Sequence, residues 1–236
     1  MMSEWKLKRF WKKADIAETD AGFAVQLDGR AVKTPAKTAL VVPTRALAEK
    51  IAEEWNAVEG QIDPSRMPFT RSSNAAIDKV CHQHAEVADM LAAYGDADLT
   101  CYRADSPQEL VARQAETWDP LLDWADAALG ARLIPVQGVV HSPQNPQALK
   151  ALSAQVHALD PFALTAFHDL VSLSGSLVIG FAALHELHDS QTLWKMSRID
   201  ELWQEEQWGE DEEAQEMAAR KESDFLHAKA FHNLSR

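Results

Sequence analysis

Two histidines and a glutamate form the pattern in this sequence that comes nearest to a metal site. His185, Glu186 and His188 stand in the order His-Glu-Leu-His. In the helix of the zinc proteases the two histidines are four residues apart, so that both lie on one face and bind the same ion. Here they are three apart, and no clear third ligand follows them. A metal-dependent hydrolase that uses these residues is kept as an alternative hypothesis, and no metal or other cofactor is expected.

Residues for nucleophilic catalysis also lie in unfavourable surroundings. The sequence has no Gly-x-Ser-x-Gly elbow and no glycine-rich phosphate loop, which excludes two common enzyme patterns. The two cysteines, Cys81 and Cys101, are too few for a disulfide framework and fit a reducing compartment. Cys81 falls on the apolar stripe of a predicted helix, so it is expected to be buried and unreactive. These patterns predict a protein that is not an enzyme.

A concentration of carboxylates is the most unusual chemical feature of the chain. Residues 200–216 read DELWQEEQWGEDEEAQE, with nine acidic residues and no basic one. The formal net charge of the chain is −13, so this segment contributes −9 and the remainder −4. Disordered acidic tails contain few aromatic residues, whereas this segment includes Trp203 and Trp208. It is therefore predicted to fold and to present a negative surface with aromatic anchors to another macromolecule.

The composition limits the classes of partner. The chain has 236 residues, of which 46% are hydrophobic and 25% charged, as in ordinary globular proteins. Its net negative charge argues against nucleic acid, whose phosphates attract basic surfaces. No stretch reaches the ~18 apolar residues of a membrane-spanning helix, so stable membrane insertion is not expected. The N-terminal residues lack the apolar run of a secretory signal, which favours a cytoplasmic location.

The N-terminal part must supply a small β-sheet. Apolar residues alternate over positions 23–27, and Asp28-Gly29 follows them. This dipeptide is a strong hairpin signal because both central residues of the favoured turn need a positive φ. Asp28 and Gly29 are therefore interpreted as structural residues. A further short strand is predicted at residues 40–42.

One helix is predicted after this sheet. Thr44 can cap a helix in which Leu47, Ile51 and Trp55 share one face. That spacing makes Trp55 a structural residue. The stretch from Gly60 to Arg71 contains two prolines and no periodicity, so it is interpreted as a linker.

Beyond the linker the chain is predicted to be almost entirely helical. The expected fold class is α+β, with a β-rich N-terminal domain over residues 1–66 and a larger α-helical domain over residues 67–236. A long apolar stripe predicts one helix over residues 77–94. Four further helix starts are predicted where a capping side chain precedes a proline, at Ser106-Pro107, Asp119-Pro120, Asn145-Pro146 and Asp160-Pro161. Residues 176–187 are apolar nearly all round and predict the central buried helix.

The helical pattern divides the acidic segment at Gly209. The helix before it is expected to have a core face made of Met196, Ile199, Leu202 and Trp203. Gly209 can end that helix because glycine tolerates the left-handed conformation. A last helix is predicted from about Glu210, which places Trp208 at the corner between the two helices.

Short segments along almost the whole chain match one known family in order. They are RFWK at 9–12, VQLDGRAVKTP at 25–35, LAEKIAEEW at 47–55, Met67-Pro68 with Thr70, Arg71 and Asn74, DLTCYR at 98–103, WDPLL at 118–122, and Trp208-Gly209-Glu210 with the acids after it. In these segments the sequence resembles the assembly chaperones that bind the alpha subunit of the F-type ATP synthase catalytic head. None of the segments is a catalytic motif.

The resemblance implies a specific function. Such a protein is an ATP-independent holding chaperone, monomeric when free, whose client is the unassembled alpha subunit. The missing transit peptide implies a bacterial relative of the mitochondrial members. The acidic segment of the family, where contact with the client is expected, maps onto Glu201, Glu205, Trp208, Gly209, Glu210 and Glu213. An acidic interaction module with another basic partner is the second alternative.

Overall fold

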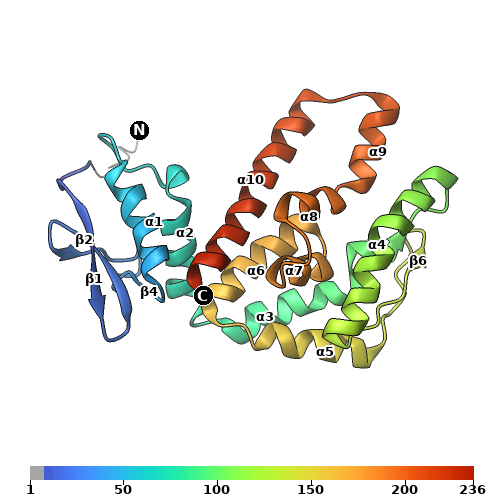
Figure 1. Ribbon diagram of the computed structural model, residues 1–236, viewed down its shortest axis with the longest axis horizontal. Coiled ribbons are helices and arrows are strands. Elements are labelled where there is room, and N and C mark those ends of the chain that lie inside the picture. Colours follow the sequence, from blue (N-terminus) through green and yellow to red (C-terminus); the bar gives the residue numbers. More distant parts are fainter. Residues whose placement is uncertain (1–7) are drawn as a thin grey trace, which may run out of the picture. The chain divides into compact units, whose positions relative to one another are not determined.

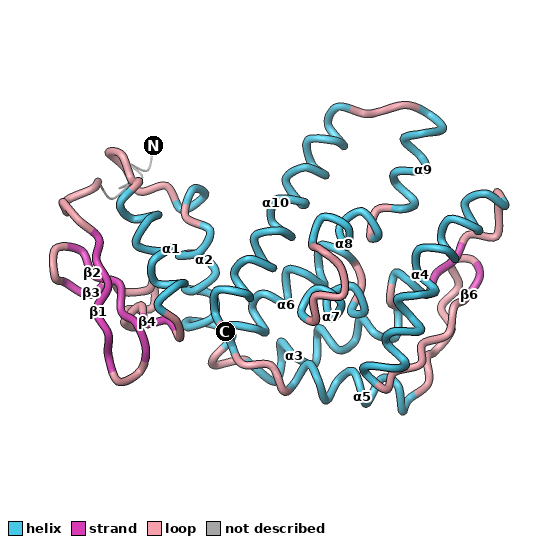
Figure 2. The backbone as a smooth tube through the Cα atoms, in the orientation of Figure 1, coloured by secondary structure: helices cyan, strands magenta, loops and turns pink. Residues whose placement is uncertain are grey.

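The computed structural model describes residues 8–236, so part of the N-terminal segment considered for a secretory signal lies outside the described residues. The chain forms two compact units. The first contains the chain up to Gln83 with residues 161–165 and 230–236, and the second contains residues 84–160 and 166–229. Strands concentrate in the first unit and helices dominate the second (Figures 1 and 2). The expected α+β class is confirmed.

The first unit is built on a small antiparallel sheet. Its strands are β1 (Ala14–Thr19), β2 (Gly22–Leu27), β3 (Arg30–Ala31) and β4 (Val41–Val42). Strand β2 pairs with the other three, and Ala14 of β1 lies opposite Leu27. The β2–β3 turn has φ values of 48° at Asp28 and 80° at Gly29, as the tightest hairpin turns require. The predicted hairpin is confirmed. The Asp28 carboxylate also accepts hydrogen bonds from the backbone N–H groups of Lys12 and Lys13.

Helix α1 (Arg45–Asn56) packs against this sheet. It begins as predicted, because the Thr44 hydroxyl accepts a hydrogen bond from the backbone N–H of Leu47 at 3.1 Å. Leu47 and Ile51 are fully buried. The Trp55 ring lies edge-on to that of Trp11, with centroids 5.2 Å apart, and the Trp11 indole donates a hydrogen bond to the Trp55 carbonyl.

Helix α2 (Pro68–Ala75) is capped by a side chain from another helix. Its own cap residue, Met67, provides no side-chain hydrogen bond. Instead the Glu54 carboxylate of α1 accepts from the backbone N–H groups of Phe69 and Thr70, at 2.6 and 2.8 Å, and from the Thr70 hydroxyl at 2.7 Å. These bonds satisfy donors that a helix start leaves open. They tie α2 to α1, so the first unit extends past residue 66; the predicted division into domains 1–66 and 67–236 stays a prediction.

The second unit is mainly helical. Its helices are α3 (His84–Ala92), α4 (Gln108–Leu129), α5 (Pro146–His157), α6 (Pro161–Ser174), α7 (Leu177–Leu184), α8 (Ser190–Met196), α9 (Ile199–Trp208) and α10 (Glu212–Ser235), and its parallel strands are β5 (Tyr102–Arg103) and β6 (Val136–Gln137). The first residues of α6 and the last residues of α10 are assigned to the first unit. Helices α5 and α6 begin at the prolines predicted for them, and the Asn145 side chain caps α5. Among the described residues, no helix is both long and apolar enough to cross a membrane.

Helix α7 forms the centre of the second unit. All eight of its residues are buried, as the nearly uniform apolar sequence predicts. A Cβ atom on Gly180 would lie 2.7 Å from a methyl group of Val171 and 2.9 Å from the Phe167 ring. Glycine is therefore needed where α7 approaches α6. Just before α7, the Ser176 hydroxyl accepts from the N–H of Ile179, which caps the helix.

Helix α4 differs from the prediction at both of its expected starts. Pro107 is its cap residue and makes no side-chain capping bond, so the predicted cap by Ser106 is wrong. The predicted start at Asp119-Pro120 is also wrong, because Pro120 lies inside one continuous helix. Buried residues on both sides, such as Trp118 and Leu121, keep the helix together despite the backbone hydrogen bond that proline cannot make. Asp119 pairs with Arg103 at 2.8 Å and caps no helix.

The helix predicted over residues 77–94 is divided. A turn of π-helix, η2 (Ala76–Val80), is followed by a turn, and α3 begins at His84. The break changes the direction of the side chains that follow it. Cys81 is therefore exposed, and the expectation that it is buried is wrong, whereas Cys101 is buried. Burial raises the pKa of the Cys101 thiol to about 12, so this thiol is unreactive at neutral pH.

Candidate functional site

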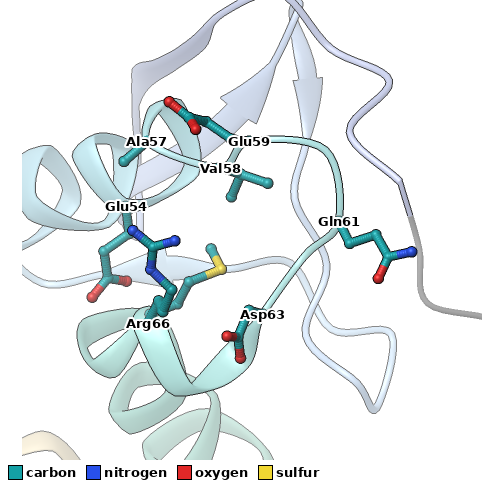
Figure 3. Close-up of a pocket in the computed structure, with 8 residues that line it drawn as sticks. Glu54, Ala57, Val58, Glu59, Gln61, Asp63 and Arg66 are labelled. Atoms are coloured by element: carbon teal, nitrogen blue, oxygen red, sulfur yellow. The ribbon is translucent and has the colours of Figure 1, made fainter.

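An open groove in the second unit separates α9 from the start of α4. Its volume is about 710 Å³, within the ~300–1,000 Å³ range of ligand sites. Three segments supply its walls: residues 102–114, Gly138 with Val139, and residues 200–208. This feature is called the α4–α9 groove below. The hollow lined by Glu54, Arg66 and Met67 in the first unit (Figure 3) has a volume of about 70 Å³, which suits only a few water molecules.

Several large apolar side chains line the α4–α9 groove in open contact with solvent. Val139 is 94% exposed and Trp208 is 79% exposed. Leu110 on α4 and Trp203 on α9 line the same groove and are half-buried. Solvent-exposed apolar side chains gathered in a concave surface are typical of binding sites for another molecule.

Helix α9 is held against α4 mainly by polar contacts. The Arg113 guanidinium donates two hydrogen bonds to the Glu206 carboxylate, at 2.8 and 2.9 Å. It also lies over the Trp203 ring, 5.0 Å from the centroid. The Gln114 amide donates to Asp200 at 2.6 Å. None of the α9 residues is fully buried, and Leu202 is 37% exposed, so the expectation of a core face on this helix is wrong. The side that faces α4 makes its contacts through polar groups and the half-buried Trp203, and no apolar side chain there is fully covered.

Acid is expected to weaken this attachment. The hydrogen bonds from Arg113, and then its charge, hold the pKa of Glu206 below the usual 4.5. A lowered folded-state pKa means that the pair stabilises the fold above about pH 4.5 and that this contribution is lost as the pH falls through the folded-state pKa. In hydrogen exchange, Glu206→Gln should speed exchange of the α9 amides relative to wild type near neutral pH, and the difference should shrink as the pH falls below about 4.5.

A matched control distinguishes this effect from general loss of charge. Glu216 pairs with Arg220 on its own helix at 3.3 Å, so Glu216→Gln removes an ion pair that joins no second helix. This variant should leave the exchange of α9 unchanged. Equal exchange of the α9 amides in Glu206→Gln and wild type at neutral pH would show that the pair does not hold α9.

The ionic groups of the groove leave it with an acidic character. Asp105 and Asp200 both line it, and Arg103 is the cation among its lining residues. Arg103 is already paired with Asp119, and its Nε donates to the Thr100 carbonyl at 2.9 Å. Asp105 is exposed and Asp200 is half-buried. Because the buried Arg103 guanidinium has partners of its own, neither carboxylate has an ion-pair partner among the described lining residues. The groove thus favours positively charged groups.

The residues predicted as a partner-binding site lie along α9 and at the start of α10. Glu201 and Glu205 lie on α9, Trp208 is its last residue, Gly209 ends it with φ of 90°, Glu210 lies in the loop to α10, and Glu213 lies in the first turn of α10. This set is called the acidic corner; Figure 2 shows the loop that joins its two helices. Helix α10 begins at Glu212, two residues after the predicted start. Trp208 is the member that also lines the groove.

The histidine pattern does not form the arrangement that a metal enzyme would need. Helix α7 ends at Leu184, and Glu186 has a φ of 57°, so His185 and His188 do not share a helical face. The His185 ring instead lies edge-on to Trp124, with centroids 5.6 Å apart. Among residues 8–236, no three histidine, cysteine, aspartate or glutamate side chains are grouped to hold a metal ion. The geometry gives the hydrolase hypothesis no support.

Comparison with known proteins places this fold in a class of chaperones. The model of the family described as ATP12 chaperone protein matches residues 8–126. The structure of Atp12 from Paracoccus denitrificans is 50% identical in sequence, with a TM-score of 0.95 over 99% of this chain and 100% of that one. The chain therefore belongs to the ATP12 chaperone family.

Two further relatives support this assignment. The Atu1473 protein from Agrobacterium tumefaciens is 40% identical, with a TM-score of 0.90 over 97% of this chain and 85% of that one. The mitochondrial protein atp12 of Schizosaccharomyces pombe is 26% identical over 222 residues, which are 89% of this chain and 76% of that protein. The family is thus represented in both bacteria and mitochondria.

Proposed function

We propose that this protein is an assembly chaperone that binds the unassembled alpha subunit of the F-type ATP synthase catalytic head in the bacterial cytoplasm. It acts as a monomer, without a nucleotide, a cofactor or a catalytic step. The observation that carries the proposal is Trp208, a large apolar side chain that is 79% exposed among the carboxylates of the acidic corner. Membership of the ATP12 chaperone family supports the same conclusion.

A holding chaperone of this kind solves a physical problem of assembly. A free alpha subunit exposes the surface that its neighbouring subunits later cover, and large exposed apolar surfaces aggregate. A protein that covers this surface keeps the subunit folded, and a better-matched subunit displaces it by mass action. The acidic corner would meet a basic patch on the client, which speeds encounter and makes binding sensitive to salt. In this proposal Glu201, Glu205, Trp208, Gly209, Glu210 and Glu213 contact the client, and Asp28, Gly29 and Trp55 are structural.

Copurification with separately expressed alpha and beta subunits tests the proposal. The chaperone is expected to capture alpha and not beta. Capture of neither alpha nor any complex that contains it would refute the proposal. Retention of another basic protein in place of alpha would favour an interaction module with a different partner.

Charge reversal tests the acidic corner itself. The double substitution Glu205→Lys with Glu210→Lys should raise the dissociation constant for alpha about tenfold, chiefly through slower association, and should reduce its salt dependence. Because Glu210 is exposed and Glu205 half-buried on an outer helix, the unfolding midpoint should change little. The same reversal at Glu116 and Asp123, exposed acids of α4, is the control. If both double variants bind alpha equally well, the contact site lies elsewhere.

A further inference from the structure

The α4–α9 groove is lined mostly by residues outside the acidic corner. We propose that it receives a client segment in which an apolar side chain stands next to an arginine or lysine. This inference rests on the proposed chaperone function and specifies the part of the client that is recognised. In this proposal the acidic corner attracts the client by charge, whereas the groove binds one short segment of the client and recognises its side chains.

The apolar part of the argument rests on side chains that the fold leaves without cover. Val139 follows β6 (Val136–Gln137) and is 94% exposed. It lines the same groove as Leu110, Trp203 and Trp208, which come from two different helices. A valine that is 94% exposed contributes no packing in the monomer. Because it lines a concave surface with other apolar side chains, it would pack against an apolar side chain of a bound partner. Aromatic side chains at such positions commonly supply most of the binding energy of an interface.

The basic part of the argument rests on Asp200 and Asp105. Gln114 bonds only one oxygen of Asp200, Oδ1, and a carboxylate has about four acceptor positions. Asp105 accepts a hydrogen bond of 3.2 Å from the neighbouring Ser106 hydroxyl and is exposed. An arginine or lysine that entered the groove would form charge-assisted hydrogen bonds with either carboxylate.

The charge of the groove disfavours anionic metabolites. A nucleotide or another phosphate compound would meet two carboxylates, while Arg103 and Arg113 are committed to Asp119 and Glu206. Anionic ligands are therefore repelled. Glu201 and Glu205 lie on α9 beside the residues that line the groove, and Glu201 is already paired with Arg198 at 2.6 Å. Glu205 is therefore the further carboxylate that a longer basic segment would meet.

Two adjacent valines provide a sharp test. Val139→Lys removes the apolar contact and puts a positive charge into the groove, which repels a basic segment, whereas Val140→Lys puts the same charge on the next residue, which is 77% exposed and does not line the groove. With purified alpha subunit, Val139→Lys should raise the dissociation constant about tenfold, and Val140→Lys should stay within about twofold of wild type. Because both sites are exposed, both variants should keep the wild-type unfolding midpoint.

Photocrosslinking identifies the segment directly. A benzoylphenylalanine at position 139 should crosslink to a peptide of alpha that contains an apolar residue beside an arginine or lysine. If wild type captures alpha but Val139→Lys captures it equally well, or if position 139 gives no crosslink in the complex, the groove proposal is wrong and the chaperone function stands. If wild type captures no alpha, both proposals fail.

Discussion

Replacing Asp98 with alanine should cost this protein about 3–5 kcal/mol of folding stability, because several buried donors would lose their acceptor, at about 1–3 kcal/mol for each one left unsatisfied. Asp98 is completely buried. Its Oδ1 accepts hydrogen bonds from the backbone N–H and hydroxyl of Thr100, at 3.0 and 2.7 Å, and from the Ser176 hydroxyl at 2.7 Å. Its Oδ2 accepts from the backbone N–H of Val178 at 3.0 Å. Alanine would leave all four donors buried without this acceptor.

The position of these donors explains why the loss should be large. Val178 lies in the first turn of the central helix α7, and Thr100 lies in the turn that precedes β5. Asp98 therefore joins two segments that are far apart in the sequence. Burial raises the pKa of Asp98, and the hydrogen bonds from Thr100, Val178 and Ser176 oppose that rise. A domain is stable by only about 5–15 kcal/mol in total, so the variant should unfold at a much lower temperature.

Urea unfolding of graded variants checks the role of each oxygen. Asp98→Asn keeps an acceptor for Thr100 and Ser176 but turns an amide N–H₂ toward the Val178 N–H. It should therefore lose about 1–3 kcal/mol, the cost of one unsatisfied buried donor. Asp123→Ala, at an exposed aspartate of α4, should change stability by less than about 0.5 kcal/mol. If Asp98→Ala were as stable as Asp123→Ala, the network would not hold α7.

Local sequence signals predicted the features of this fold that depend on neighbouring residues. Asp28-Gly29 specifies its hairpin because few other dipeptides accept two positive φ angles. Thr44 and Asn145 specify helix starts because their side chains reach backbone N–H groups two or three residues ahead. The same reasoning failed at Asp119-Pro120, where packing on both sides of the proline decides the outcome. It failed at Cys81 because an apolar stripe does not show where a helix is interrupted.

The candidate site was predictable only in part, for a related reason. The acidic corner is contiguous in sequence, so its charge and its tryptophan are evident from the order of the residues alone. The α4–α9 groove is assembled from residues near 105, 139 and 204, and no local pattern links them. Arg113 and Gln114 look like ordinary surface residues of a helix, and only their contacts with Glu206 and Asp200 reveal that they position α9. Asp98 belongs to one of the segments that resemble the family, but its hydrogen-bond network includes Val178, which is distant in the sequence.

Replacing Trp208 with alanine should produce the largest loss of client binding. Trp208 belongs to both the acidic corner and the α4–α9 groove, and a tryptophan at the centre of an interface typically contributes at least about 2 kcal/mol. The dissociation constant for the alpha subunit should therefore rise about thirtyfold or more. The stability of the chaperone should not change, because the side chain is 79% exposed. Titration of fluorescently labelled chaperone with purified alpha measures the first quantity, and thermal unfolding measures the second.

Met217 provides the matched control for this substitution. It is 53% exposed on α10 and does not line the groove, so Met217→Ala should bind alpha as wild type does. If Trp208→Ala lowers the unfolding midpoint and leaves binding intact, the indole stabilises the α9–α10 corner and does not contact the client.

The kinetics separate the anchor from the charges around it. Loss of a buried aromatic contact appears mainly as faster dissociation, whereas reversal of surrounding charges appears mainly as slower association that depends on salt. Trp208→Ala should therefore accelerate dissociation at every salt concentration, and the Glu205 and Glu210 reversal should slow association most at low salt. An alanine variant with normal dissociation and slow association would mean that Trp208 shapes the acidic surface without entering the interface.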